Sequence, residues 1–570
     1  MNKKDDYNKR IIIATILSTI LMVLWIRYYG KKTIPAEVLQ AQKEIKQEQI
    51  IEIKEEEKID IEIQQEEISF NENEILEERL LNIDTEKLKG SINLRGLVFD
   101  NLILENYKQE IGSNEKVKLL SEQNSNDAYF VKFNWESEDK NLDLPNINTV
   151  WSSNSSTLTI NKPVILSYKN KQGLTFQLII TLDSNYMFEF RQVVINPTEN
   201  TYIIKTNNQI SRKNAVLDRS VSVHEGFIGS FNKELEEIKY KKIEKRDYDF
   251  KKGFSWAGWS DKYWLVAFAQ QAKHENMANV NVNYSNKLYN IDFESENMVV
   301  SPKQKIEFNT LLFAGPKILN LLDIYSFQYN LPLFDRAVDF GWFYFLTKPI
   351  YIVLKFFYGI LGNFGVAILL LTLLVKTIMY PFTKKSFISM AKIKQIQPKI
   401  DNLKNVYGND KLGLNKAMMD LYKKENVSPL SGCLPMLVQI PVFFSLYKVL
   451  AISIDMRQAP FFGYIKNLAE KDPTTIWNLF GLLPYHVNFL HIGLLPCLMS
   501  LTMWIQQKMT SASGGSSSNQ DMQTATKMMP LIFLFLFSSM PAGLLIYWTF
   551  SNIISIGQQY YVEKKVIKTK

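Results

Sequence analysis

A positively charged side chain lies inside one of the most apolar stretches of the chain. Lys376 falls within residues 362–381, four residues after Thr372 and therefore on the same face of a helix. A lysine in hydrocarbon costs at least about 2.5–3.5 kcal/mol on insertion scales, far more than a neighbouring Leu or Ile returns. Two interpretations stay open. The amine reaches the membrane surface near Lys384, about 12 Å along the helix, or it has a function inside the membrane.

Polar residues recur in the inner halves of the other apolar stretches. Each needs a partner if it faces lipid, and they are Gln439, Thr502, Gln506, Ser551 and Asn552. Scattered hydrogen bonds between helices would satisfy them. The alternative is a shared water-filled cavity, open to the cytoplasm, in which Lys376 is the single positive charge.

Motifs for metal, nucleotide or nucleophilic chemistry are not recognisable in the sequence. The four histidines are not spaced as metal ligands, and both cysteines, Cys433 and Cys497, lie in apolar segments, which excludes a disulfide framework. A net charge of +8 over 570 residues does not by itself indicate nucleic-acid recognition. We therefore expect no metal, no cofactor and no direct nucleic-acid recognition.

The elements that must position these residues are membrane-spanning helices. Residues 11–26 are an apolar run with basic flanks and no small-residue cleavage site, which favours an uncleaved anchor within residues 1–30 over a signal peptide. Three later stretches approach the roughly 20 residues that a crossing needs, and the last block is nearly twice as long, with a break at Pro541. The further crossings expected are 362–381, 434–454, 487–505, 525–540 and 543–561.

The distribution of lysines fixes the orientation of these crossings. Residues 384–428 hold ten lysines and four acidic residues, whereas residues 455–484 hold three basic and three acidic residues. Because positive loops stay inside, the first of these is cytoplasmic. Six crossings then place both termini in the cytoplasm, where the loop 506–524 and the basic tail 562–570 also lie.

The middle of the chain is polar and reads as water-exposed. Residues 31–80 are an acidic tract with almost no aromatic side chains, typical of a tether. Residues 81–320 contain many short alternating runs, such as the one over 174–182, which predict an antiparallel β-sandwich outside the membrane. In this region Trp256, Trp259 and Trp264 are expected in a core rather than on a binding surface. Residues 321–361, rich in aromatics and lysine, predict an amphipathic helix in the membrane interface.

The basic loop over 384–428 has the spacing of a helical hairpin. Apolar residues step by three and four from Ile393 to Tyr407, and the same spacing resumes after a turn at 408–410. A charged helix pair is often only a solvated surface. Its lysines lie beside the membrane, however, so they are candidates for docking anionic lipid or a cytoplasmic partner: Lys392, Lys394, Lys404, Lys416 and Lys423.

Four sequence motifs, in order, resemble a known family. They are KTIMYPFTKKSFISMAKIKQIQPKI, YKKENVSPLSGCLPMLVQIPVFFSLY, MRQAPF and MPAGLLIYWTFSNIISIGQQ. Together they are similar to the membrane core of the YidC/Oxa/Alb membrane protein insertases, and the anchor followed by a large β-domain resembles the Gram-negative form. The resemblance implies an α-helical polytopic protein of the bacterial inner membrane, with an N-terminal anchor, a five-helix insertase core and a periplasmic antiparallel β-supersandwich.

The resemblance also implies a function that needs no nucleotide and is not enzymatic. Members accept hydrophobic segments of nascent membrane proteins in a hydrophilic groove, release them into lipid and assist their folding. The implied partners are nascent membrane proteins, membrane lipids, the Sec translocon, and the ribosome with its targeting machinery. Residues matching groove positions are Lys376, Thr372 and Gln439, with Ser551 and Asn552 nearby, and Tyr547 and Trp548 match contacts with the substrate helix.

One position departs from the family pattern. The family has an arginine in the groove where this sequence has Lys376. Lysine keeps the charge but loses the planar fork that binds a carboxylate through two parallel hydrogen bonds. A transporter is a rival interpretation, but the sequence shows neither internal repeats nor an acidic residue inside a span. A sugar-processing enzyme is a second rival, for which no acid/base pair can be assigned.

Overall fold

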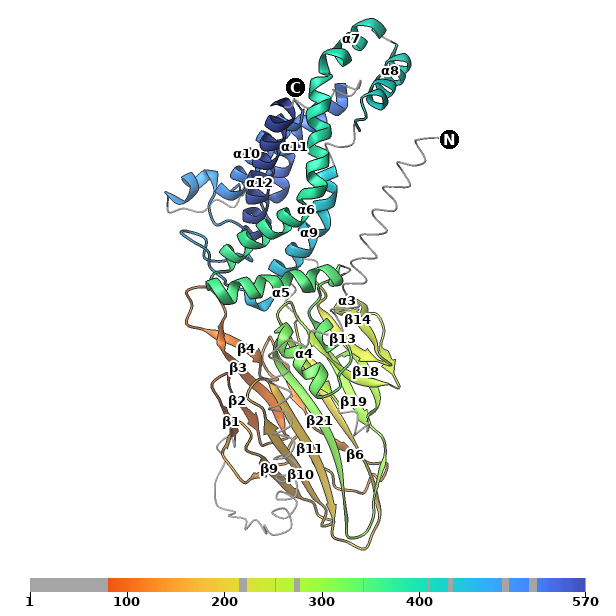
Figure 1. Ribbon diagram of the computed structural model, residues 1–570. Helices are drawn as coiled ribbons and strands as arrows, with labels where there is room; N and C mark the ends of the chain where they lie inside the picture. The colour runs from red at the N-terminus through yellow and green to blue at the C-terminus, as the bar shows by residue number, and fades with distance from the viewer. Residues whose placement is uncertain are drawn as a thin grey trace.

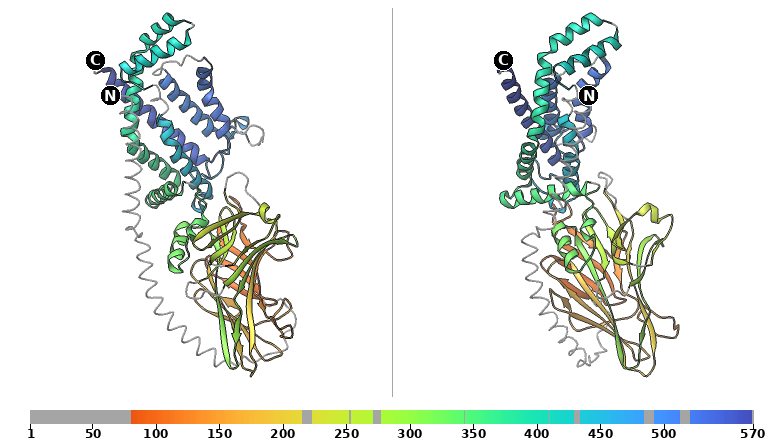
Figure 2. Two further views of the ribbon diagram at one scale, coloured as in Figure 1. Left: turned by 90° about the vertical axis from the view of Figure 1, so that its right-hand side faces the viewer. Right: turned by 45° about the vertical axis from the view of Figure 1, so that its right-hand side comes forward.

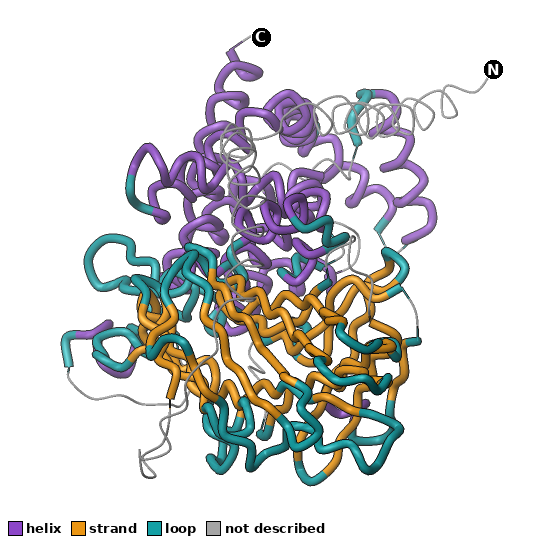
Figure 3. Tube along the Cα trace, turned by 90° about the horizontal axis from the view of Figure 1, so that it is seen from below, coloured by secondary structure: helices purple, strands orange, loops and turns teal. Residues whose placement is uncertain are grey.

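A computed structural model describes residues 80–214, 223–251, 253–270, 277–341, 343–408, 410–428, 434–483, 492–511 and 520–568. The anchor and the acidic tether expected before Leu80 lie outside the described residues. The strands form one end of the molecule and the helices the other, with a helical hairpin projecting farthest from the strands (Figures 1 and 2). Figure 3 shows the same separation from below.

Two large sheets make up the β-domain. The first runs in the order β15 (Tyr248–Phe250), β18 (Met277–Ser285), β19 (Leu288–Ser295), β12 (Tyr202–Arg212), β5 (Tyr129–Lys132), β3 (Val98–Lys108), β2 (Leu88–Asn93), β1 (Leu80–Asp84) and β8 (Thr157–Leu158), with β4 (Lys116–Leu120), β6 (Trp135–Glu136) and β20 (Met298–Val300) paired beside it. The second runs β14 (Glu234–Lys239), β13 (Gly226–Phe231), β16 (Phe254–Ser260), β17 (Trp264–Ala269), β21 (Gln304–Pro316), β11 (Met187–Asn196), β10 (Thr175–Leu182), β9 (Val164–Lys169) and β7 (Ser152–Ser153). Among the described strands only the short β1–β8 pairing is parallel.

Aromatic and aliphatic side chains from both sheets meet in one core. The alternating run predicted over 174–182 is β10, and its Phe176, Leu178 and Ile180 are fully buried. Across the sandwich, the rings of Phe133 and Phe190 lie 4.3 Å apart, within the range of favourable aromatic contact. The period-two pattern therefore identified the strand and its core-facing side chains, although Gln177 and Ile179 on the other face are buried as well.

The tryptophans of β16 belong to this core. Trp256 and Trp259 are fully buried, and their indole N–H groups donate to the carbonyl oxygens of Pro332 and Ile210. Trp264, on the next strand β17, is half-buried, and its ring lies edge-to-face with that of Tyr107 at a centroid distance of 5.2 Å. A buried indole with its donor satisfied is a packing residue.

The segment 321–361, expected to hold one interfacial helix, holds two. The helix α4 (Leu319–Gln328) packs on the β-domain, where the Tyr325 hydroxyl donates to Asp183. Positive φ angles at Asn330 and Leu333, on either side of Pro332, then turn the chain before the 3-10 helix η1 (Phe334–Ala337). The apolar α5 (Tyr344–Leu361) follows and lies across the base of the helical bundle (Figure 1).

The remaining helices form the bundle and the hairpin. They are α6 (Phe364–Gln395), α7 (Gln397–Tyr407), α8 (Lys411–Lys424), α9 (Leu434–Ile452), α10 (Leu494–Ser511), α11 (Gln520–Phe537) and α12 (Ala542–Lys568), with the 3-10 helices η3 (Ile454–Met456) and η4 (Ile476–Gly481) between α9 and α10, and the short α3 (Tyr240–Ile243) in the β-domain. By length and composition, two described helices, α5 and α6, are apolar enough to cross a membrane. The helical structure is interrupted between α11 and α12, next to Pro541, as the sequence predicts.

Several helix boundaries differ from those expected. The helix α6 continues 14 residues past residue 381, α10 and α11 extend into both ends of the expected loop 506–524, and α12 continues through Lys568 into the expected tail 562–570. For α6 the reason lies in its packing. A fall in hydropathy reports where the membrane ends, but a helix continues as long as its next turn packs, as Ile393 of α6 does in the hairpin core.

Ionic and polar contacts join the β-domain to the outer ends of the bundle helices. Lys448 of α9 lies 3.5 Å from Asp339, which also accepts the backbone N–H of His224. After η3, the Arg457 guanidinium donates to the backbone oxygen of Gln109 at the end of β3. These contacts hold α9, which carries Gln439, against the β-domain.

A buried lysine gives the β-domain a predicted dependence on pH. Lys317 is 3% exposed, and its amine donates to Ser260 Oγ at 3.1 Å. Burial lowers the pKa of Lys317 from 10.5 to about 8, against the attraction of Asp261 and other nearby carboxylates. Between these values the unfolded chain holds the proton and the folded chain does not, so the free energy of unfolding rises with pH.

The expected result is a gain of about 2 kcal/mol for the wild type relative to Lys317→Met as the pH rises from about 8 to about 10. Comparing the two proteins removes the contribution of other groups that titrate in this range. Hydrogen exchange in β16 and β17 of the full chain measures the difference. A constant difference across that range would show that Lys317 does not titrate as its burial requires.

Candidate groove site

The Lys376 amine lies between three helices of the bundle. It comes from the middle of α6, the side chain is 8% exposed, and the amine donates to Gln439 Oε1 of α9 and Ser555 Oγ of α12, both at 2.8 Å. The side chain is therefore directed into the bundle rather than along α6 toward Lys384.

A second set of hydrogen bonds extends from Gln439. Its amide nitrogen donates to Ser551 Oγ at 2.5 Å and lies 3.4 Å from the Tyr547 hydroxyl. Tyr547, Ser551 and Ser555 are spaced by four residues, so they form one polar stripe along α12. This stripe faces α6 and α9, and it connects Lys376 to four side chains in one network.

Two of the predicted groove residues lie outside this network. The Asn552 amide donates to Thr502 Oγ1 at 3.1 Å and so joins α12 to α10. The Thr372 hydroxyl donates to the Ile368 backbone oxygen of its own helix at 2.7 Å, and its side chain is fully buried. Thr372 lies four residues before Lys376, on the same face of α6, but the two side chains donate hydrogen bonds to different partners.

Sequence reasoning missed Ser555. The four-residue spacing from Tyr547 through Ser551 was a signal that could have found it, because that spacing continues directly to Ser555. Serine is small and common in membrane helices, however. Ser555 differs from its neighbours only in its position on the side of α12 that faces α6.

The electrostatics of the network favour binding of an anion. Within the described part of the chain, both hydrogen-bond partners of the Lys376 amine are neutral oxygens. A lysine ammonium has three N–H donors, so one more acceptor can be bound without breaking either contact. A carboxylate has the right charge and the right acceptors for this position.

Comparison with known proteins identifies the family. The family model described as the YidC periplasmic domain matches residues 80–353, and the one described as the 60Kd inner membrane protein matches residues 356–569. The chain belongs to the YidC family of membrane protein insertases. The resemblance of its four motifs is thereby confirmed.

Curated YidC relatives cover most of the chain. The membrane protein insertase YidC of Rickettsia prowazekii (strain Madrid E) is 46% identical over 491 residues, which is 85% of this chain and 87% of the relative. The Rickettsia conorii insertase is 45% identical over the same shares. A crystal structure of active YidC insertase with the first transmembrane domain resolved aligns at 15% identity and a TM-score of 0.35, over 85% of this chain and 93% of that one.

The two aromatic residues predicted to contact substrate lie in different surroundings. Tyr547 is fully buried, and its hydroxyl accepts from the Gln439 amide of α9. Trp548 is half-buried, and its ring lies 4.7 Å from that of Phe443 and 5.0 Å from that of Phe537. It thus belongs to an aromatic cluster formed by α9, α11 and α12.

The hairpin lysines surround an apolar seam. The buried residues of this seam include five whose spacing predicted it, and Tyr422 and Val427 pack with them. The five are Ile393, Ile396, Ile400, Leu414 and Met418. Lys392 and Lys416 are exposed. Lys394 lies 3.6 Å from Glu563 of α12, Lys404 lies 3.7 Å from Asp401, and Lys423 lies 3.3 Å from Asp420. These pairs make the hairpin surface less positive than its lysine count suggests.

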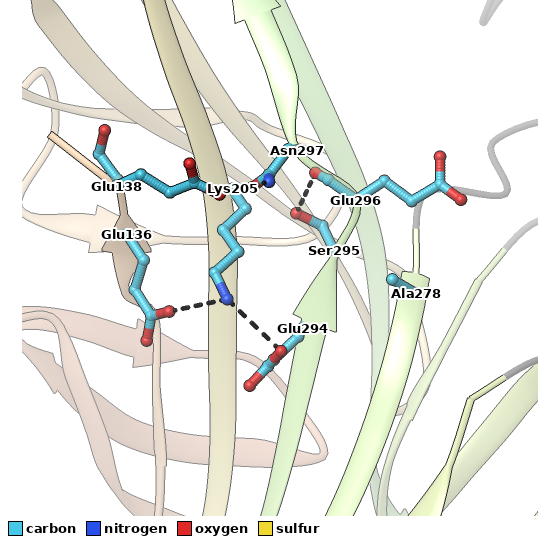
Figure 4. A pocket seen from close by; sticks show the side chains of 9 residues that line it. Glu136, Glu138, Lys205, Ala278, Glu294, Ser295, Glu296 and Asn297 are labelled. Atoms are coloured by element: carbon cyan, nitrogen blue, oxygen red, sulfur yellow. Dashed lines mark hydrogen bonds and ion pairs between the residues drawn. The ribbon is translucent and has the colours of Figure 1, made fainter.

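A hollow of about 550 Å³ in the β-domain gathers several carboxylates (Figure 4). The Lys205 amine lies between Glu136 and Glu294, 3.2 Å and 3.4 Å from their oxygens. Lys205 and Glu136 are directly opposite each other on β12 and β6. Cross-strand ion pairs of this kind are an ordinary feature of antiparallel sheets.

Proposed function

We propose that this chain inserts hydrophobic segments of nascent proteins into the bacterial inner membrane through a groove centred on Lys376. The observation that carries the proposal is the network joining Lys376, Gln439, Ser551 and Ser555 in a member of an insertase family. A buried amine surrounded by neutral acceptors supports attraction of acidic residues in the arriving segment. The chain would also assist the folding of its substrates.

The membrane placement belongs to the same proposal. The bundle helices cross the inner membrane with the hairpin in the cytoplasm, the β-domain in the periplasm and both termini in the cytoplasm. The asymmetry of lysines between the two loops supports this orientation. The helix α5 then lies in the outer interface, which fits its position across the base of the bundle (Figure 1).

Insertion follows from partitioning without a nucleotide. Polar groups in the inner half of the bundle shorten the hydrocarbon distance that a translocated polar segment must cross, and the fixed charge of Lys376 attracts its acidic residues. The hydrophobic substrate helix moves past Trp548, and past Tyr547 once the helices separate, into lipid. Burial of its apolar surface supplies the free energy.

The cytoplasmic surfaces would supply substrates to the groove. The exposed lysines of the hairpin and the basic end of α12 would contact the ribosome and the targeting machinery, and the chain would act alone or with the Sec translocon. The ion pair of Lys394 with Glu563 supports a hairpin held at a fixed angle over α12.

Reconstitution tests the proposed function. In vesicles that contain only this chain, a single-span substrate with a short acidic translocated segment should become protected from external protease. Empty vesicles, and vesicles with Lys376→Ala, are the controls. Passage of small solutes without any protection of the substrate would point to a transporter instead.

A further inference from the structure

An open hollow of about 370 Å³ lies between α6 and α12 on the outside of the bundle. Its lining residues are Thr377, Tyr380, Gly557, Gln558 and Tyr561. The volume falls within the range of about 300–1,000 Å³ that is typical of small-molecule sites. The groove network leaves this hollow unused, because Lys376 and Ser555 are buried and point into the bundle.

The backbone of Gly557 faces the open space of the hollow. A Cβ at this position would meet nothing within 4 Å, so the space is open rather than filled by a neighbour. Both helices also carry exposed apolar side chains: Ile378 is 64% exposed, Phe382 56% and Ile553 50%. On a membrane-spanning pair such side chains face hydrocarbon chains.

Lysines from both helices stand at one end of the hollow. On α6, Tyr380 is followed four residues later by Lys384 and then Lys385, and on α12 Tyr561 is followed three residues later by Lys564. This spacing keeps Lys384 and Lys564 on the face that carries the tyrosine of their helix, and Lys385 is the direct neighbour of Lys384. All three lysines are exposed, and both helices end on the hairpin side of the bundle (Figure 1).

The carboxylate next to Lys564 in the sequence has partners elsewhere. Glu563 is 8% exposed, lies 3.6 Å from Lys394 and accepts a hydrogen bond from Gln559 at 3.0 Å. It therefore contributes to the base of the hairpin. Basic side chains from two helices stand at the end of the hollow.

We propose that this hollow binds one anionic phospholipid from the cytoplasmic leaflet. An acyl chain lies along Gly557 between the two tyrosines, and the phosphate is held by Lys384, Lys385 and Lys564. Aromatic residues at the membrane interface and basic clusters between helix ends on the cytoplasmic side are the features by which such headgroups are recognised. The proposal rests on the membrane placement described above, in which α6 and α12 cross side by side.

Lipid retention by the full chain tests the proposal. The purified protein is titrated with phosphatidylglycerol or with phosphatidylcholine of the same acyl chains, and bound lipid is counted by native mass spectrometry. We expect one phosphatidylglycerol to be retained about tenfold more tightly than phosphatidylcholine. Equal retention of the two lipids would overturn the proposal, and so would displacement of phosphatidylglycerol by inorganic phosphate, which has no acyl chain.

Two variants separate the acyl chain from the headgroup. Gly557→Leu fills the hollow and should weaken retention of both lipids about tenfold, whereas Gly359→Leu, at an equally open position on α5, should change neither. Replacing Lys384, Lys385 and Lys564 together by Gln should abolish the preference for phosphatidylglycerol. Unchanged retention in Gly557→Leu, or an unchanged preference in the triple variant, would contradict the site.

The same preparations distinguish this proposal from the insertase function. Lipid retention is measured without any substrate. Loss of insertion with the lipid preference intact would remove the proposed function and leave the lipid site. Loss of the preference with insertion intact would remove the lipid site alone.

Discussion

Replacing Lys376 with alanine is expected to lower the insertion of a substrate with an acidic translocated segment at least about tenfold. The amine is the cation of the groove network, and a charge-assisted hydrogen bond to a carboxylate contributes about 1.5–3 kcal/mol, which corresponds to roughly 10- to 150-fold. The substitution also leaves Gln439 and Ser555 without their shared donor. Protease protection in proteoliposomes, with acidic and neutral substrates compared, measures the effect.

If Lys376 acts through its charge, two further results are expected. Lys376→Arg keeps the cation and should retain insertion of both substrates, although its fork must find new geometry beside Gln439. Lys384 is a surface lysine farther along α6, and Lys384→Ala should leave the selectivity for acidic substrates unchanged. If Lys376→Ala lowered insertion of acidic and neutral substrates equally, the lysine would have a structural role and not an electrostatic one.

Asp472→Ala is expected to destabilise the bundle by at least about 3 kcal/mol. The carboxylate is fully buried and accepts from the Leu495 N–H at 2.7 Å, the Thr474 N–H at 2.9 Å and the Thr474 hydroxyl at 2.7 Å. It therefore caps the start of α10, and each buried donor left without an acceptor costs about 1–3 kcal/mol.

Thermal unfolding of the detergent-solubilised chain measures this loss. Asp420→Ala is the matched control, because Asp420 is exposed on α8, where it pairs with the exposed Lys423, and its loss should change the unfolding free energy by less than about 0.5 kcal/mol. Asp472→Asn should fall between the two, since one acceptor oxygen is retained. Equal midpoints for Asp472→Ala and Asp420→Ala would show that the cap does not support α10.

The sequence was sufficient wherever periodicity and composition act locally. The alternating run of β10, the hairpin seam around Ile400 and the break next to Pro541 all follow from spacing within a few residues. The predicted core position of Trp256 also agrees with the structure. These features do not depend on which distant elements pack together.

Features that depend on distant contacts could not be predicted. Asp472 looks like a surface carboxylate in a polar loop, and only the return of the chain at Leu495, 23 residues later, buries it. Lys317 likewise gives no sign of burial, because the strand that holds Ser260 lies 57 residues away. The extension of α6 beyond residue 381 could not be predicted for another reason. Hydropathy indicates whether a helix is surrounded by lipid or water, but it does not indicate where the helix ends.

The candidate site was predicted in part. Charge and polarity inside apolar helices identified Lys376, Gln439 and Ser551, because each is costly in lipid and needs a partner. The rotation of α12, which brings Ser555 to Lys376 and turns Asn552 toward Thr502, depends on packing between helices, so the four-residue spacing to Ser555 was not sufficient to identify it.

Site-specific photo-crosslinking to a stalled nascent membrane protein tests the central claim most directly. A photoreactive residue is placed at Gln439, inside the network, or at Ile440, which is the adjacent exposed position on α9. The account predicts strong crosslinks to the substrate helix from Gln439, and their reduction by Lys376→Ala when the translocated segment is acidic. Crosslinks from Ile440 with none from Gln439 would place the substrate on the outer surface of the bundle and contradict a groove centred on Lys376.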